Sequence, residues 1–336
     1  MSTRFTDFIS SFGVMMIGLA VLGFGSVTLT QAKVESVVAR FPLSKAQIID
    51  ETQLVRMAMF PVSQPAVPRI AEQEVFTGSQ TAESIVVVDD KTNTVLYKKN
   101  ATAIRSLASI TKLMTALVLL ETPMRWASST VIVEADLADD TYLKVGERYQ
   151  LRDLWDVGLV GSSNSAMRAM VRESGLSEEN FVARMNDKAR ALGLLTMRFV
   201  EPTGLDNLNM GSTLDVARLL QVTLEQEMIK KTLSIQEYFA QPLNSKEKRR
   251  IWSTNWLLTR WIPHQFSEQV IGKTGFIADS GYNLAVAVTD AQKHRLRVVV
   301  LGASSNEFRF SEARDIAEWV FVHVRWPEDN FAAIIQ

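Results

Sequence analysis

Short apolar runs rich in β-branched residues lie near both ends of the chain and predict strands. The first two runs, 84–89 and 94–97, are separated by the turn-forming residues 90–93, which predicts a β-hairpin. After the middle of the chain, three more strands are expected, over 270–276, 282–289 and 295–301.

Helical spacing dominates the middle of the chain. Residues 110–120 are apolar and contain neither Gly nor Pro, and Ser212 or Thr213 is a suitable N-cap for a helix over 216–227. Further helices are expected over 151–159, 166–172, 178–192 and 311–324. Strands at both ends with helices between them predict an α+β domain whose terminal segments share one antiparallel sheet, with helices packed on it and a central helical cluster.

The N-terminal segment, residues 1–32, has the character of an export signal. Residues 8–30 carry no charge and follow Arg4, and the length of this stretch fits either a signal peptide or a membrane anchor. Both outcomes place the remainder outside the cytoplasm, in the periplasm or at the cell surface. We expect the anchor to be retained.

The remaining chain divides into a stalk, a domain and a tail. Residues 33–81 are irregular, and three prolines between residues 60 and 70 favour an extended stalk. The domain is expected over 82–327, followed by a short tail over 328–336.

Composition excludes several kinds of chemistry. The 336 residues include no cysteine, which rules out a thiol nucleophile and a cysteine metal site. A net charge of −1 gives no general attraction to nucleic acid, so no nucleic-acid partner is expected. The three histidines, His264, His294 and His323, form no metal-binding pattern, and we expect no metal and no cofactor.

Candidate chemistry comes from a serine and a lysine on one predicted helical face. Ser109 precedes Lys112 by three positions, so the amine can take the proton that makes the hydroxyl nucleophilic. This spacing is common by chance, and it recurs at Ser245 and Lys248 in a charged run that predicts a solvated loop. Ser-x-Asn occurs at 162–164, 253–255 and 304–306, whereas Lys-Thr-Gly occurs once, at 273–275.

The sequence around these motifs resembles that of a known family. Residues 105–116, 199–205 and 272–276 are similar to segments of low-molecular-mass penicillin-binding proteins, the serine-type D-alanyl-D-alanine carboxypeptidases and endopeptidases of peptidase family S11. The resemblance extends over about 82–326 and implies a β-lactamase/transpeptidase-like fold. It also implies that the substrates are peptidoglycan stem peptides and that β-lactams acylate the enzyme.

The resemblance assigns a role to each motif. It implies that Ser109 is the nucleophile, that Lys112 is its base and that Ser162 passes a proton to the leaving amine. The substrate would be held by Asn164, Lys273, Thr274 and Gly275. The oxyanion would be bound by the backbone N–H groups of Ser109 and Phe276. We favour Ser162 over Ser253 because it lies between two predicted helices, as the family requires.

Some residues depart from the family pattern or admit a second reading. Ser163 stands where the family usually has glycine, which puts a side chain beside the site. Glu201 invites comparison with the deacylating base of β-lactamases, although the sequence that follows it fits the peptidases better. Three tryptophans, at 252, 256 and 261, could stack on sugar rings, but this spacing is more typical of core packing.

Alternative functions remain open from the sequence. The family cuts either terminal D-alanine or D-alanyl cross-links, and the short stretch after the last predicted helix favours the endopeptidase branch. A β-lactamase is the alternative enzyme. A membrane-tethered sensor that is acylated without turnover is the non-catalytic alternative.

Overall fold

The structure is a computed structural model that describes residues 67–71, 74–138 and 140–327. The predicted N-terminal segment 1–32, most of the predicted stalk and the tail 328–336 lie outside the described residues. Within the part that is described, no helix is both long and apolar enough to cross a bilayer.

A five-stranded antiparallel sheet forms the base of the domain, in the order β10-β11-β12-β2-β3. The bounds are Ser84–Asp89 for β2, Val95–Lys99 for β3, Ile271–Ile277 for β10, Gly281–Thr289 for β11 and Arg295–Ala303 for β12. The hairpin β2–β3 adds to the C-terminal strands through β12, with Val87 opposite Val298. The prediction of one antiparallel sheet built from both ends of the chain is therefore confirmed.

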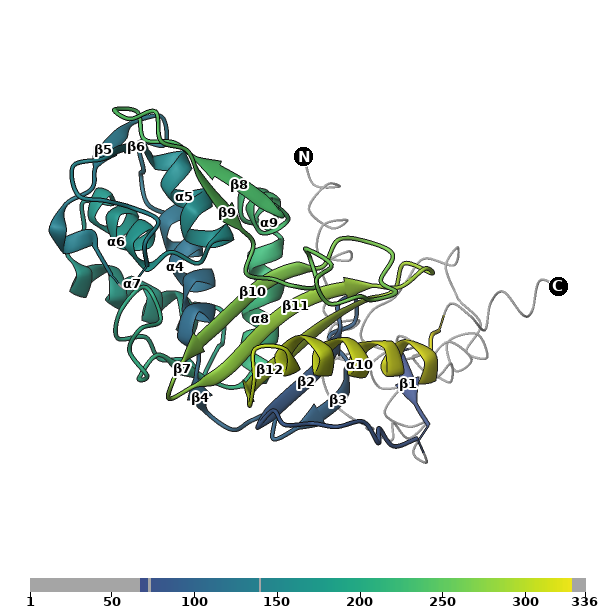
Figure 1. Cartoon of the computed structure of the whole chain (residues 1–336). Coiled ribbons are helices and arrows are strands. Elements are labelled where there is room, and N and C mark those ends of the chain that lie inside the picture. Colours follow the sequence, from purple (N-terminus) through teal and green to yellow (C-terminus); the bar gives the residue numbers. More distant parts are fainter. Residues whose placement is uncertain (1–66, 72–73, 139, 328–336) are drawn as a thin grey trace, which may run out of the picture. The chain divides into compact units, whose positions relative to one another are not determined.

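Helices cover both faces of the sheet (Figure 1). Alternate residues of β2 point to opposite faces, as strand geometry requires. Ile85 and Val87 pack in the layer that contains α10, Phe308–His323. Val86 and Val88 pack in the other layer, which contains α8, Thr213–Leu224. β2 is buried along its whole length, as a β-branched run covered on both sides should be.

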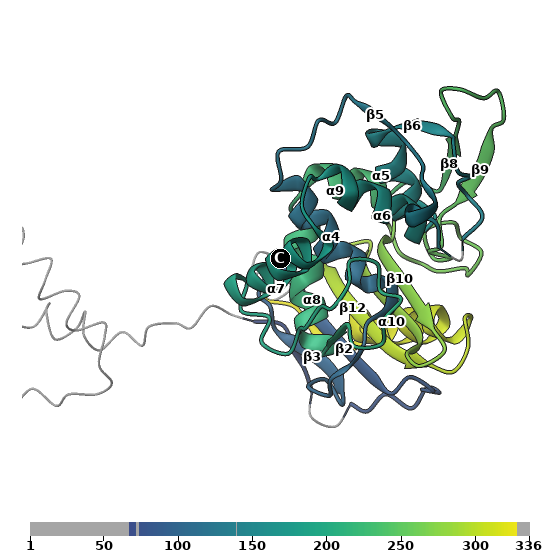
Figure 2. The ribbon, with the colours of Figure 1, turned by 90° about the vertical axis from the view of Figure 1, so that its left-hand side faces the viewer.

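A helical cluster lies beside the β10 edge of the sheet (Figure 2). Its central helix α4, Thr111–Leu120, is buried at nine positions, from Thr111 to Leu119, which explains why most of its residues are apolar. The other helices are η1 Ala108–Ile110, η2 Glu134–Asp136, α5 Leu151–Val160, α6 Asn164–Glu173, α7 Glu178–Ala191 and α9 Glu227–Leu233. Ser212 is the N-cap of α8 and accepts the backbone N–H of Asp215.

Short two-stranded ribbons connect these helices. They pair β4 Arg105–Ser106 with β7 Met210–Gly211, β5 Ser129–Val131 with β6 Arg148–Gln150, and β8 Glu237–Ala240 with β9 Arg249–Trp252. The β8–β9 hairpin and α9 were not predicted from the sequence. The loop between β8 and β9, which contains Ser245 and Lys248, was predicted.

The packed region begins before residue 82, so the predicted stalk ends too late. β1, Arg69–Ile70, pairs with β13, Val324–Arg325, after the end of α10. Phe76 makes edge contacts with Tyr97 and Trp319. Proline disfavours a helix but not an edge strand that starts just after it, and β1 follows Pro68 directly.

Candidate active site

Ser109 and Lys112 occupy the turn that leads into the central helix. Ser109 lies in η1, and Lys112 lies in the first turn of α4 with none of its surface exposed. The Lys112 Nζ is 2.7 Å from Ser109 Oγ. Ala108 has a φ of 47°, a left-handed conformation that is uncommon outside glycine and is often found at functional sites. The predicted pair is therefore in hydrogen-bond contact.

The oxygens around Lys112 Nζ determine which way a proton can pass. The amine also contacts Asn164 Oδ1 at 2.5 Å and the Thr203 carbonyl oxygen at 2.8 Å. A carbonyl oxygen can only accept, so these two contacts use two N–H bonds. A charged ammonium donates its third N–H to Ser109, whereas a neutral amine presents its lone pair there. Neutral Lys112 is therefore placed to accept the hydroxyl proton of Ser109.

The Ser-x-Asn motif at 162–164 lies at the start of α6. Ser162 has a φ of 60°, a second left-handed residue at the site. Ser163 is buried, and its hydroxyl accepts the backbone N–H of Ala166 at 3.0 Å and donates to Asp140 at 3.0 Å. Ser163 thus serves as the N-cap of α6, which explains how a side chain is accommodated where the family usually has glycine.

Lys273 is the second buried amine and comes from strand β10. Its Nζ donates to Ser162 Oγ at 2.6 Å and to the Thr274 carbonyl oxygen at 3.0 Å. Burial lowers the pKa of Lys273 well below its usual value, and the positive charges of Lys112 and Arg309 lower it further. The charges of these two neighbours therefore add to burial in opposing the protonation of Lys273.

Two glycines enclose the nucleophile turn and allow it to pack closely. A Cβ on Gly204, which has a φ of +94°, would lie 2.0 Å from the Ala108 carbonyl oxygen. A Cβ on Gly275 would lie 2.7 Å from the Leu107 carbonyl oxygen and 3.1 Å from the backbone nitrogen of Ser109. The sequence analysis gave Gly275 the task of admitting a peptide, and the structure adds the close approach of the nucleophile turn.

The close contact between the nucleophile turn and Gly275 also brings together the two groups of the predicted oxyanion site. The backbone nitrogen of Ser109 lies against β10 at Gly275, and Phe276 is the next residue of the strand. The Phe276 side chain is 49% exposed and stacks on Tyr282, with ring centroids 4.2 Å apart. The two N–H groups assigned to the oxyanion thus belong to neighbouring segments.

Thr274 connects β10 to the segment that follows β9. Its hydroxyl lies 2.6 Å from that of Thr254, and the backbone N–H of Thr254 donates to the carbonyl oxygen of Val160. In the alternative Ser-x-Asn match, the Asn255 amide donates to Val270 and its carbonyl oxygen accepts from Leu257. Those contacts give Asn255 a structural role in a loop.

Glu201 organises the loop that supplies the Thr203 carbonyl. One carboxylate oxygen accepts the backbone N–H of Thr203 at 2.8 Å and its hydroxyl at 2.5 Å. The other accepts the backbone N–H of Gly204 and, at 2.5 Å, the side chain of Asn209. Four donors therefore occupy a carboxylate that a deacylating base would need free to activate water.

Arg309 of α10 supports β10 from the far side of the sheet. It is buried and donates to the Gly275 carbonyl oxygen at 3.0 Å and to the Asn283 carbonyl oxygen at 3.3 Å. Burial lowers the pKa of Arg309 to about 10, so its guanidinium remains charged at neutral pH. It therefore places a fixed positive charge behind the Lys-Thr-Gly strand.

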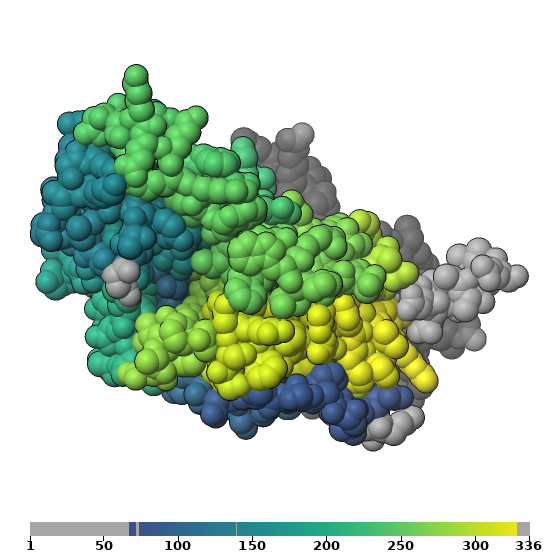
Figure 3. Space-filling model, viewed as in Figure 1, coloured from purple at the N-terminus to yellow at the C-terminus, as the bar shows by residue number. Residues whose placement is uncertain are grey.

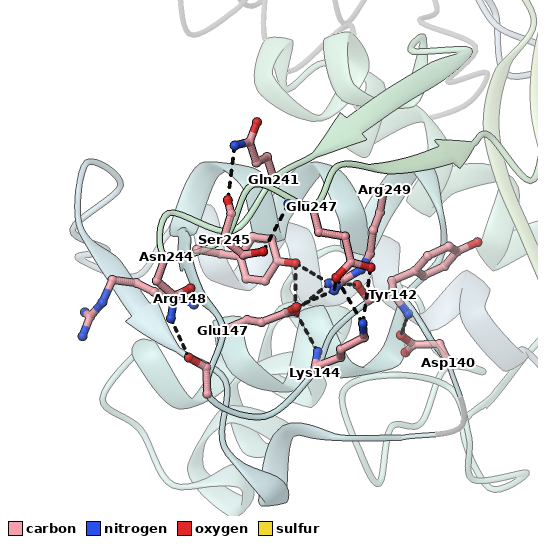
Figure 4. Close-up of polar contacts among 12 residues, drawn as sticks. Asp140, Tyr142, Lys144, Glu147, Arg148, Gln241, Asn244, Ser245, Glu247 and Arg249 are labelled. Atoms are coloured by element: carbon pink, nitrogen blue, oxygen red, sulfur yellow. Dashed lines mark hydrogen bonds and ion pairs between the residues drawn. The ribbon is translucent and has the colours of Figure 1, made fainter.

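A polar network joins the β8–β9 hairpin to the loop before α5 (Figure 4). Arg249 forms an ion pair with Glu147 in which both side chains are 11% exposed, and it also contacts the Tyr149 hydroxyl at 2.7 Å. The same stretch of chain includes Asp140, which accepts from Ser163 and Ser165 beside the site. The network thus anchors one wall of the site.

Three of these contributors were not predicted from the sequence. The Thr203 carbonyl, Asp140 and Arg309 reach the site from distant parts of the chain. Only Thr203 had a signal, since it lies in the segment 199–205 that resembles the family. Within the described ranges, no three histidine or acidic side chains converge in a way that could hold a metal ion.

The surface is hollowed where the two parts of the domain meet. Figure 3 shows this hollow between the teal helical cluster and the green segment that includes residues 250–275. Lys112 joins the segments containing Ser109 and Asn164 within the helical cluster, and the hydrogen bond from Lys273 to Ser162 links that cluster to β10. A serine activated by a buried lysine, beside a five-stranded sheet covered on both faces, defines a class of serine acyl hydrolases.

Comparison with known proteins identifies the family. A family profile described as D-alanyl-D-alanine carboxypeptidase, peptidase family S11, matches residues 70–305. The chain belongs to this family and is a hydrolase of the serine peptidase type. The resemblance found in the sequence is thereby confirmed.

Individual relatives agree with this assignment. A D-alanyl-D-alanine endopeptidase of Haemophilus influenzae is 32% identical, over 67% of this chain and 75% of the relative. A D-alanyl-D-alanine carboxypeptidase of Bacillus subtilis is 31% identical, over 71% of this chain and 62% of the relative. A solved variant of a Streptomyces DD-transpeptidase has a TM-score of 0.66 at 25% identity, over 73% of this chain and 99% of the other. The predicted fold class is thus confirmed.

Proposed function

We propose that the chain is a serine DD-peptidase that cuts D-alanyl bonds in peptidoglycan stem peptides and that its preferred bond is the cross-link. The observation that carries the proposal is the position of Lys112 Nζ. It is 2.7 Å from Ser109 Oγ, and the Asn164 Oδ1 and Thr203 carbonyl oxygens also lie within hydrogen-bond distance of it. This arrangement makes Ser109 a nucleophile without a histidine.

The reaction proceeds through an acyl-enzyme. Neutral Lys112 takes the hydroxyl proton of Ser109 as the oxygen attacks the D-alanyl carbonyl carbon. The negative charge that forms on the carbonyl oxygen is stabilised by the N–H groups of Ser109 and Phe276, a contribution of about 3 kcal/mol per donor in comparable sites. A proton passes through Ser162 to the departing amine, and the C–N bond breaks. Water then attacks the ester and releases the acid and Ser109.

Lys273 and Thr274 define the leaving side of the site. We assign them the carboxylate of the residue after the scissile bond, because a buried cation beside a hydroxyl is suited to an anionic group. That carboxylate also compensates the charge of the buried amine. Binding of the correct leaving residue therefore favours the charged form of Lys273.

The preference for cross-links is supported by the relatives. Endopeptidases of Haemophilus influenzae, Pseudomonas aeruginosa and Escherichia coli are 28–32% identical and are matched over 75–86% of their lengths. Carboxypeptidases with 26–31% identity are matched over 62–64%. Both groups share the catalytic domain, so the choice of bond belongs to the surroundings of the site.

An extracytoplasmic location is part of the proposal. Its support is the uncharged segment 8–30, which suits a signal peptide or a membrane anchor at residues 1–32. Peptidoglycan lies outside the cytoplasm, so the proposed substrate requires the same location. An epitope tag at the N-terminus that is found in the membrane fraction would support a retained anchor. Loss of the tag from the mature protein would support cleavage of a signal peptide.

The test uses the purified full chain with a defined mixture of muropeptides. We expect mass spectrometry to show cross-linked dimers converted to monomers, faster than pentapeptides lose their terminal D-alanine. Ser109→Ala should abolish both reactions and labelling by fluorescent penicillin. Full activity of the Ser109→Ala variant would refute the mechanism, and exclusive release of D-alanine would refute the preference for cross-links.

The same reagents decide between a peptidase and a β-lactamase. Because Glu201 is fully occupied by donors, we expect the penicilloyl-enzyme to persist over the time of the assay. Rapid turnover of penicillin would favour the β-lactamase instead.

A further inference from the structure

Two exposed tryptophans form an aromatic surface next to the site. Trp252 ends β9 and is 36% exposed, and Trp261 is 51% exposed in the loop that follows. Their ring centroids are 5.7 Å apart. We call this pair the Trp252–Trp261 platform. The sequence analysis expected all three tryptophans of this stretch to pack in the core, and the structure contradicts this for these two.

The third tryptophan explains how the platform is held. Trp256 stacks on Phe310 with ring centroids 5.4 Å apart, and its own centroid lies 5.7 Å from that of Trp261. On the other side, the guanidinium of Arg250 lies 4.4 Å from the centre of the Trp252 ring and pairs with Glu237. The platform is thus an aromatic surface supported by Trp256, with the Arg250 guanidinium over the Trp252 ring and Glu237 paired to it.

The platform lies at the leaving side of the site. Trp252 is two residues from Thr254, a separation of at most about 7 Å between Cα atoms. Thr254 touches Thr274, to which we assign the leaving carboxylate, whereas the oxyanion lies further along β10 at Phe276. A substrate chain that follows these two positions therefore has its leaving part, and not its acyl part, next to Trp252.

We propose that the Trp252–Trp261 platform binds an amino-sugar ring of the glycan attached to the leaving stem of a cross-link, an inference that rests on the proposed function. Sugar rings present faces of C–H groups that stack on tryptophan, and their hydroxyl and acetamido groups suit Arg250 and Glu237. A terminal D-alanine has nothing beyond its carboxylate to reach this surface. A cross-linked stem continues into a second glycan strand.

The distance from Thr254 to the Trp252 ring is similar to the distance from the scissile bond to the sugar. In a stem cross-linked through its third residue, about three residues separate the scissile bond from the sugar, roughly 10 Å of extended peptide. The two-residue step from Thr254 to Trp252, together with the reach of an indole ring, covers a similar distance. The platform therefore provides a reason for a preference for cross-links that lies outside the catalytic residues.

The experiment compares one double variant, Trp252→Ala/Trp261→Ala, on matched substrates. The first is a cross-linked muropeptide dimer with its sugars, and the second is the same peptide dimer after enzymatic removal of the sugars. For the sugar-bearing dimer, we expect kcat/KM to fall about tenfold, chiefly through KM, as the loss of two ring contacts implies. The sugar-free dimer should change by less than about twofold.

Three controls make the comparison specific. Acylation by fluorescent penicillin, which has no leaving glycan, should be unchanged in the double variant. Trp252→Tyr/Trp261→Tyr should restore most of the activity on the sugar-bearing dimer. Leu195→Ala removes an apolar side chain that is 88% exposed after α7, and it should affect neither substrate.

Each contrary outcome has its own meaning. Equal losses on both dimers would show that the platform contacts peptide, and the assignment to a glycan would be wrong. A parallel loss of penicillin acylation would assign the tryptophans a structural role, and unchanged kinetics would also overturn the proposal. If the native enzyme is acylated but cleaves no dimer, the proposed preference for cross-links fails before the variants are compared.

Discussion

Lys273 Nζ donates a hydrogen bond to Ser162 Oγ over 2.6 Å, and this contact joins the edge of the sheet to the loop before α6. The amine sits in a fully buried position near a second lysine and an arginine. Removing this amine from water opposes folding, whereas its position allows it to contact Ser162 in the site. The domain therefore keeps an unfavourable group because the reaction requires it.

The first prediction is that Lys273→Met stabilises the fold while removing activity. The folded-state pKa of Lys273 lies below the ordinary 10.5, so the unfolded chain binds more protons between the two values. The penalty is complete below the folded pKa and disappears as the pH approaches 10.5. We expect a gain of about 1–2 kcal/mol at pH 7, measured by urea unfolding.

The matched control for that change is Lys248→Met, an exposed lysine in the β8–β9 loop. It should leave the free energy of unfolding unchanged at each pH. A Lys273→Met variant that is less stable than the native chain at every pH would show that the hydrogen bond to Ser162 outweighs the desolvation.

A second prediction concerns the two kinds of left-handed glycine. Gly204→Ala brings a Cβ within 2.0 Å of the Ala108 carbonyl oxygen, whereas Gly146, with a φ of +84°, has nothing within 4 Å of that position. Gly146→Ala should cost only backbone strain, about 1 kcal/mol. Gly204→Ala should cost about 3 kcal/mol or more and slow acylation by fluorescent penicillin. Equal losses of stability in the Gly204→Ala and Gly146→Ala variants would show that the nucleophile turn moves aside at little cost in free energy.

A third prediction separates positioning from deacylation at Glu201. Glu201→Gln replaces a carboxylate that accepts two backbone N–H groups, among its four donors, with an amide that carries its own N–H bonds, so the Thr203 carbonyl should shift away from Lys112. We expect acylation by penicillin to slow about tenfold or more, with an altered pH dependence. Normal acylation with a slower release of the penicilloyl group than in the native chain would instead identify Glu201 as the deacylating base. Glu178→Gln, at the exposed start of α7, is the control.

A fourth prediction tests the buried ion pair in Figure 4. Burial alone would raise the pKa of Glu147, but its hydrogen bonds with Arg249 hold that pKa below the usual 4.5. The pair therefore stabilises the fold at neutral pH, and this contribution is lost as pH falls through the depressed value. Glu147→Gln should cost about 3 kcal/mol at pH 7, with the difference from the native chain shrinking below about pH 4.

The control for the ion pair is Glu247→Gln, because Glu247 also contacts Arg249 but is exposed. Its replacement should change the unfolding midpoint little at any pH. If the two variants were equally destabilised, the burial of Glu147 would not be the cause.

The sheet and most helices followed from local patterns, since β2 and β12 contain β-branched runs and α4 is mostly apolar and free of Gly and Pro. The β8–β9 hairpin did not, because its inward-facing Arg249 is satisfied by Glu147, which lies 102 residues earlier. A charged residue in that stretch predicts a loop unless its partner is known. Sequence alone places such partners only when they are neighbours along the chain.

The site divides in the same way. The three-residue spacing of Ser109 and Lys112 could be read directly, because helix geometry fixes it. The Thr203 carbonyl oxygen contacts Lys112 from 91 positions away along the chain. Arg309 contacts the Gly275 carbonyl oxygen from 34 positions away. Their contributions depend on the packing of the sheet against the helices, which local pattern does not specify.

The strand order has a consequence for the timing of activity during synthesis. The N-terminal hairpin β2–β3 pairs with the rest of the sheet only through β12, and Lys273 arrives with β10. A growing chain that has passed Ser109 and Ser162 thus holds the nucleophile before the sheet that will hold it in place exists. The contact between Ser162 and Lys273 therefore forms only when the C-terminal strands have been made and paired, so a chain that stops before β10 would lack the complete site.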